Sequence, residues 1–149
     1  MVFVSGGTGP QEKRIRARVA ALHPQIRDIG HQRDVPAALA AMDLFVLPSL
    51  WEWMPLTVLE VMRAGVAVVA SDADGTAEVV RDGETGRLVP KSNGPALTAA
   101  IRDLLDDSVT RRRLAAAGAD FVTTRFDAGS LARRTEALYR SSLGSQTRQ

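Results

Sequence analysis

Two glutamates, Glu52 and Glu60, stand on either side of a predicted helix start, with seven residues between them. Pro55 suits the first position of a helix and Gly65 suits its end, so the pattern predicts a helix from Leu56. The free N–H groups at a helix start attract anions such as phosphate, whereas a carboxylate accepts hydrogen bonds from hydroxyl groups. These residue types at this spacing indicate a ligand that carries both phosphate and hydroxyl groups.

The residues around this helix predict where it lies. The run Asp43–Leu47 is short and apolar, which is typical of a buried strand, and it ends at Pro48. In an open parallel sheet, a strand–loop–helix junction lies at the carboxyl ends of the strands, where ligands bind. The apolar neighbours of Glu60 predict a helix without a polar face, so we expect its carboxylate to be partly buried and to bond a protein donor or a ligand hydroxyl. We expect Glu52 to reach into the same crevice.

The rest of the chain alternates short apolar runs with helical patterns. The expected strands are 2–4, 25–29, 43–47, 66–71 and 84–90, and further helices are expected at 11–22, 35–42 and 77–81. This alternation predicts an α/β fold with a parallel sheet of about five strands. From residue 93 or 94 to 143 the pattern is helical, with breaks near Asp107 and at 127–129. We expect one domain over 1–126, followed by a C-terminal helix and polar tail over 127–149.

Composition narrows the function. The chain of 149 residues has no cysteine and is 45% hydrophobic, which favours one globular domain without disulfides or cysteine-based metal sites. Neither a secretory signal pattern nor an apolar run near 18 residues is present, so we expect a cytoplasmic protein without a membrane span. The net charge of +2 is low, and the arginines at 111–113 and 133–134 are expected on solvated helix faces, so nucleic acid is not an expected partner.

Several stretches resemble the retaining, nucleotide-sugar-dependent glycosyltransferases with the GT-B fold, of the glycosyl transferases group 1 type. The central one, Pro48–Gly65, is similar to P-S-x-x-E-x-x-P-L-x-x-L-E-x-M-x-x-G, the signature of that family. Other matches are similar to the family's G-x-G-P strand end, its next strand end, its P-V-V-A-T run and its E-V-V-x-D-G-x-x-G-x-L-V run; they lie at 2–10, 29–30, 67–71 and 78–89. The resemblance covers residues 2–126.

This resemblance implies a three-layer Rossmann-like parallel sheet that binds the donor nucleotide-sugar, from which a hexosyl group passes to an unknown acceptor. Glu52 is the candidate catalytic residue, a positioning group that bonds hydroxyls of the donor sugar, and Glu60 would accept a hydrogen bond from the ribose. Backbone N–H groups around Met54, Leu56 and Thr57 would meet the diphosphate. No cofactor and no metal are implied. The full set of candidate donor-binding residues is Glu52, Trp53, Met54, Pro55, Leu56, Thr57, Glu60, Gly7, Gly9, Gly30, His31, Gln32 and Arg33.

Two residues depart from the family pattern. Trp53 stands directly after Glu52, where the family has glycine, and its indole would fill the donor pocket or move the loop. Asp74 replaces one glycine of a G-G pair and adds negative charge near the expected phosphates. Both changes are expected to weaken donor binding.

The resemblance also implies parts that do not precede Met1. The family's donor domain opens with a strand and a helix that carry an arginine and a lysine for the diphosphate, after an entire acceptor-binding domain. Because that strand lies in the middle of the sheet, a chain truncated at its N-terminus must close the gap, borrow a strand or expose an edge. We therefore expect this fragment to be inactive alone and to have a partner chain, a missing acceptor domain or a homodimer.

Alternative functions rest on other features. A non-catalytic nucleotide-binding or interaction module, in which Trp53 fills the old crevice, is the main alternative. The loop 5–10 suggests a dinucleotide site, but it lacks a spaced third glycine and only Asp28 is available as the acidic partner. Asp72 and Asp74 could bind a divalent metal. A nucleotide-sugar epimerase or a glycosyl phosphorylase shares the architecture, but neither Lys13 nor Lys91 sits in a context that matches a pyridoxal phosphate lysine.

Overall fold

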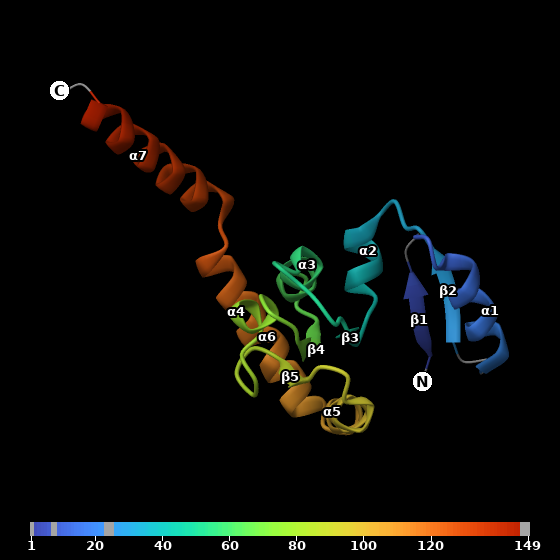
Figure 1. Ribbon diagram of the computed structural model, residues 1–149. Coiled ribbons are helices and arrows are strands. Elements are labelled where there is room, and N and C mark those ends of the chain that lie inside the picture. Colours follow the sequence, from blue (N-terminus) through green and yellow to red (C-terminus); the bar gives the residue numbers. More distant parts are fainter. Residues whose placement is uncertain (1, 7–8, 23–25, 147–149) are drawn as a thin grey trace. The chain divides into compact units, whose positions relative to one another are not determined.

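The computed structural model describes residues 2–6, 9–22 and 26–146 (Figure 1). Strands and helices alternate along these residues, which confirms the predicted α/β class. The strands are β1 (Phe3–Gly6), β2 (Ile26–Gly30), β3 (Leu44–Leu47), β4 (Ala67–Asp72) and β5 (Arg87–Pro90). The helices are α1 (Glu12–Leu22), α2 (Val35–Ala40), α3 (Leu56–Arg63), α4 (Thr76–Val79), α5 (Gly94–Asp106), α6 (Ser108–Arg125) and α7 (Ala128–Gln146).

The strands form two parallel sheets. One sheet pairs β1 with β2, and the other has the order β3-β4-β5. Val46 lies opposite Val69 in the β3–β4 pair, and Ser71 lies opposite Val89 in the β4–β5 pair. In the described part of the chain β3 therefore hydrogen-bonds to β4 alone. The predicted parallel strands are present, but they are divided between these two sheets.

The chain divides into two compact units, Met1–Ala38 and Leu39–Gln149, and each is described here by itself. The expected domain boundary after residue 126 stays a prediction. In the first unit α1 packs on β2, and Arg16 of α1 forms an ion pair of 2.6 Å with Asp28 of β2. Ile15 of α1 is 47% exposed, and the sheet that the described residues of this unit form has two strands.

The core of the second unit is built around β4. Every residue from Ala67 to Ser71 is buried, as expected for a central parallel strand covered on both faces. On one face, Val68 and Ala70 pack with Val58, Val61 and Met62 of α3 and with Val122 of α6. On the other face, Val69 packs with Ala100 and Leu104 of α5 and with Leu114 of α6. This unit therefore has the layered helix–sheet–helix arrangement that was predicted.

The C-terminal helices begin at capped residues. The Asn93 side chain accepts a hydrogen bond from the Ala96 N–H at the start of α5, and Asp107 accepts from Val109 and Thr110 at the start of α6. The predicted break near Asp107 is confirmed, as is the break between α6 and α7. While α5 and α6 pack on the sheet, the described side chains of α7 are exposed except for the half-buried Ser130. None of the helices in the described ranges is long and apolar enough to cross a membrane.

Candidate functional site

The candidate site lies where β3 and β4 end at the same edge of the parallel sheet. The loop 48–55 connects β3 to α3, and the short turn 73–75 connects β4 to α4. These two connections touch, because the Gly75 N–H donates a hydrogen bond to the Glu52 carbonyl oxygen at 2.9 Å. A Cβ atom at position 75 would lie 1.7 Å from the carbonyl oxygen of Trp53. Only glycine therefore allows the Glu52–Trp53 backbone to rest on the start of α4.

Asp74 occupies a backbone conformation that explains why a glycine is usual there. Its φ of 41° is in the left-handed region, which aspartate tolerates better than most residues. Its carboxylate is 3.9 Å from the Lys91 ammonium group, and both side chains are about half exposed. The negative charge predicted for this position thus has a nearby positive partner, although an exposed pair of this kind contributes little stability.

Glu52 is held in place by its own loop. Its side chain is half-buried, and its Oε1 atom accepts a hydrogen bond of 2.8 Å from the Ser49 hydroxyl. No donor among the described residues engages the other carboxylate oxygen. Glu52 is therefore an oriented acceptor with free capacity for a ligand hydroxyl.

Glu60 differs from its prediction. It was expected to be partly buried, but it is exposed, and no donor from the described part of the chain reaches its carboxylate. The reason is the helical period of α3: Val58, Val61 and Met62 face the core, whereas Glu60 lies on the opposite stripe with Leu56. Of the two predicted partners for this carboxylate, a protein donor is therefore absent in the described residues, and the ligand hydroxyl stays a prediction.

The start of α3 leaves backbone donors unused. Pro55 has no N–H, and no side chain caps this helix. The N–H groups of Met54 and Thr57 have no acceptor among the described residues. The N–H of Leu56 donates to the Met54 carbonyl at 2.9 Å, so it has a protein acceptor here, and its contact with a diphosphate stays a prediction. At this helix start, the N–H groups that remain open are therefore those of Met54 and Thr57.

Trp53 does not fill a crevice of its unit. Its side chain is 96% exposed, although an indole buried in the site was one predicted consequence of its replacing glycine. Trp51 is 74% exposed, and Leu50, Met54 and Leu56 are exposed as well. The loop therefore presents apolar side chains outward beside the half-buried Glu52.

The remaining candidates belong to the first unit. Gly9 and His31–Arg33 are at its surface except for the half-buried Gln32, and Gly30 has a φ of 61° with its N–H bonded to the Asp28 carboxylate. Gly7 lies outside the described residues. Asp28 also pairs with Arg16, so it is not free for the ribose of a dinucleotide. Within the second unit, the candidates lie together along the loop 48–55 and the first turns of α3.

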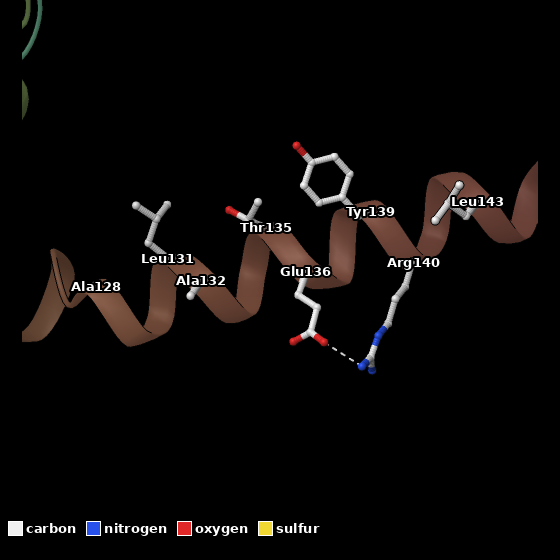
Figure 2. A pocket seen from close by; sticks show the side chains of 8 residues that line it. All are labelled: Ala128, Leu131, Ala132, Thr135, Glu136, Tyr139, Arg140 and Leu143. Carbon is white, nitrogen blue, oxygen red and sulfur yellow. Dashed lines mark hydrogen bonds and ion pairs between the residues drawn. The ribbon is translucent and has the colours of Figure 1, made fainter.

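Two other surfaces do not add to the site. The described residues contain no cluster of three or more histidine, cysteine, aspartate or glutamate side chains that could hold a metal ion, and Asp72 and Asp74 are both exposed. A concave surface lies along α7, where Leu131, Thr135 and Tyr139 point to one side in Figure 2 and Glu136 bonds Arg140. None of the candidate donor-binding residues lines that surface.

Two contributors were not predicted from the sequence. Ser49, which orients Glu52, stands three residues before it, at a spacing at which serine commonly bonds within a loop. Gly75 positions the backbone of the loop from a separate segment. An Asp-Gly pair directly before a helix is a turn signal, but it does not indicate which other loop the glycine meets.

The parallel strands and the helices on both faces of β4 define a Rossmann-like domain, which is the architecture that the resemblance to the GT-B glycosyltransferases predicts. Residues 1–107 match the family described as Glycosyl transferases group 1. A phosphatidyl-myo-inositol mannosyltransferase of Mycobacterium leprae is 37% identical over 131 residues, which are 86% of this chain and 35% of that protein. An alpha-D-kanosaminyltransferase of Streptomyces kanamyceticus is 30% identical over 142 residues, which are 93% of this chain and 37% of that protein.

Two solved structures are similar to this chain in fold. HepE of Anabaena in complex with UDP has a TM-score of 0.87 at 23% identity, over 94% of this chain and 41% of that one. A sucrose-phosphate synthase from Thermosynechococcus elongatus has a TM-score of 0.87 at 28% identity, over 97% of this chain and 38% of that one. This chain belongs to the glycosyl transferases group 1 family. It spans between 35% and 41% of the length of the relatives and structures just described.

Proposed function

We propose that this chain is the donor-binding part of a retaining glycosyltransferase, which takes a hexosyl group from a nucleoside diphosphate sugar. The observation that carries the proposal is the arrangement at the start of α3. Met54 and Thr57, whose N–H groups are free among the described residues, stand in the sequence between Glu52, which has an open acceptor position, and Glu60, which has no donor from the described residues. Such a site suits a diphosphate flanked by hydroxyl-bearing sugars.

The chemistry proposed for this half is electrostatic. A leaving nucleoside diphosphate gains negative charge, and the α3 N-terminus with its open donors stabilises that charge. Glu52, held by Ser49, positions the sugar by its hydroxyls, and Glu60 accepts from the ribose. The proposal needs no metal at the diphosphate, so EDTA is expected to leave nucleotide affinity unchanged. A cytoplasmic location is part of the proposal and agrees with a chain that has no cysteine.

The activities and the ligand named for similar proteins support the proposal. Two of them are a mannosyltransferase and a kanosaminyltransferase, and HepE was solved with UDP. Because the matched proteins are more than twice as long as the match, we propose that acceptor binding needs further polypeptide and that this chain binds donor without turnover.

Calorimetry with UDP, GDP, ADP and their hexose derivatives tests the proposal. At least one nucleotide is expected to bind to the folded chain at millimolar concentration or below. If none binds while circular dichroism shows the fold intact, the donor-site proposal fails. A non-catalytic interaction module, which the exposed apolar loop around Trp53 favours, then becomes the better account.

A further inference from the structure

The loop between β3 and α3 reverses the usual distribution of polar and apolar side chains. Trp51 and Trp53 are 74% and 96% exposed, whereas the carboxylate between them is half-buried. On an ordinary surface loop the apolar side chains are covered and the charged one is solvated. Ligand sites combine apolar lining with a few oriented polar groups, and this loop has that composition.

The backbone of Trp53 lies against the turn after β4. Its carbonyl lies so close to Gly75 that a Cβ there would approach it to 1.7 Å, and the preceding carbonyl accepts the Gly75 N–H at 2.9 Å. The Trp53 indole is therefore attached to a backbone segment that this turn holds, and it stands next to Glu52 and Met54 in the sequence. Trp51 has no such contact with the turn after β4.

We propose that the Trp53 indole stacks on the pyranose ring of the donor sugar and so contributes to the choice of donor. A pyranose has C–H groups on its faces and hydroxyls around its edge. The indole would cover a C–H face, while the neighbouring Glu52 carboxylate accepts from the edge hydroxyls. This inference rests on the proposed function, because it assigns a sugar to the same site. A protein partner is the less suitable occupant, since charged groups are depleted at the cores of protein interfaces.

The experiment compares each nucleotide with its own sugar derivative. Calorimetry on the whole chain gives the ratio of affinities for UDP-glucose over UDP and for GDP-mannose over GDP. For whichever of these two pairs the chain binds, Trp53→Ala is expected to lower the affinity ratio by about tenfold. The affinity for the nucleotide itself is expected to stay unchanged. Trp53→Phe keeps an aromatic face and is expected to retain most of the ratio. Trp51→Ala, the matched control on the same loop, is expected to leave the ratio unchanged.

The other outcomes each overturn the inference. An unchanged ratio in Trp53→Ala, an equal loss for nucleotide and nucleotide-sugar, or an equal effect of Trp51→Ala shows that the indole does not contact the sugar. Tighter nucleotide-sugar binding by Trp53→Ala shows that the indole obstructs the site. If the unaltered chain binds none of UDP, GDP, ADP and their hexose derivatives, the proposed function fails and the stacking fails with it. Nucleotide binding with an unchanged ratio overturns the stacking alone.

Fluorescence gives an independent readout. The chain has two tryptophans, so Trp51→Phe leaves Trp53 as the only indole. Its emission is expected to shift to shorter wavelength with the nucleotide-sugar and to stay unchanged with the nucleotide. If calorimetry shows that the nucleotide-sugar binds and the emission wavelength does not change, the stacking is contradicted.

Discussion

The Gly75 N–H donates to the carbonyl oxygen of Glu52 at 2.9 Å, which ties the turn after β4 to the loop after β3. This hydrogen bond joins two segments more than twenty residues apart in sequence at the edge of the sheet where both strands end. The positions of the Glu52 carboxylate and of the open N–H groups of Met54 and Thr57 depend on the path of the backbone from this loop into α3. The backbone contact at Gly75 is therefore as important to the site as the side chains that would meet a ligand.

Replacing Gly75 is expected to disturb the site and the fold together. The new Cβ in Gly75→Ala would lie 1.7 Å from the Trp53 carbonyl oxygen, so the loop must move. We expect a loss of about 1–3 kcal/mol in the free energy of unfolding and weaker UDP binding. Urea denaturation and calorimetry measure the two effects. Gly94→Ala is the control, because nothing lies within 4 Å of its added Cβ. Unchanged stability and affinity in Gly75→Ala would show that the two connections are not in contact.

Glu60→Gln is expected to weaken nucleotide binding without destabilising the protein. The carboxylate is exposed and has no donor from the described residues, so its stability effect should stay within about 0.5 kcal/mol. Loss of the ribose contact should lower UDP affinity by about tenfold, which calorimetry detects. Glu78→Gln, an exposed glutamate on α4, is the matched control and should change neither quantity. Equal affinities for all three proteins would remove Glu60 from the site.

Two buried threonines are expected to respond in opposite ways to replacement by valine. The Thr76 hydroxyl is fully buried and has no partner among the described residues, so Thr76→Val should leave stability unchanged or raise it. The Thr85 hydroxyl accepts the Arg81 N–H at 2.9 Å, so Thr85→Val leaves that donor unpaired. We expect it to cost about 1–3 kcal/mol in urea denaturation. A costly Thr76→Val would reveal an unseen hydrogen bond at that hydroxyl.

Asp107 makes the stability of the second unit depend on pH. Hydrogen bonds from Thr110, together with that from Val109 and the charge of Arg111, hold the pKa of Asp107 below its usual value of 3.8. A lowered folded-state pKa stabilises the fold above pH 3.8, and the contribution is lost as the pH falls through the folded-state pKa. In Asp107→Asn, the thermal unfolding midpoint should therefore fall less between pH 4 and pH 2 than it does in the unaltered chain. Asp127, whose pKa is lowered by Ser130, stays intact in this variant and accounts for part of the remaining slope. Parallel curves for the two proteins would contradict the role of Asp107.

Much of the fold was predictable because local signals agree with it. Pro55 and Gly65 bracket α3 as predicted, and the apolar run that became β4 is buried on both faces. The helix cap at Asp107 was predicted as a break and is one. Each of these features depends on residues that are close together in sequence, which pattern analysis handles well.

The site was less predictable where its geometry depends on distant segments. Glu60 was expected to be partly buried because its neighbours in sequence are apolar, but the helical period turns it outward. Trp53 is exposed, and its backbone meets Gly75, a residue on another loop. The Gly75 contact lies outside the loop 48–55 and could not be found from that loop alone, whereas the outward position of Glu60 follows from the period of α3, which is a local signal.

The position of β3 at the edge of its three-stranded sheet has a practical consequence for work with this chain. All four residues of β3, Leu44–Leu47, are apolar and only half covered, and the strand bonds to β4 alone in the described part of the chain. An unpaired edge strand of this apolar composition can pair with extended segments of other chains and so promote aggregation. Preparations should therefore scatter more light per molecule as they are concentrated. Dilute stocks, rather than added reductant, are what will keep this cysteine-free protein monodisperse.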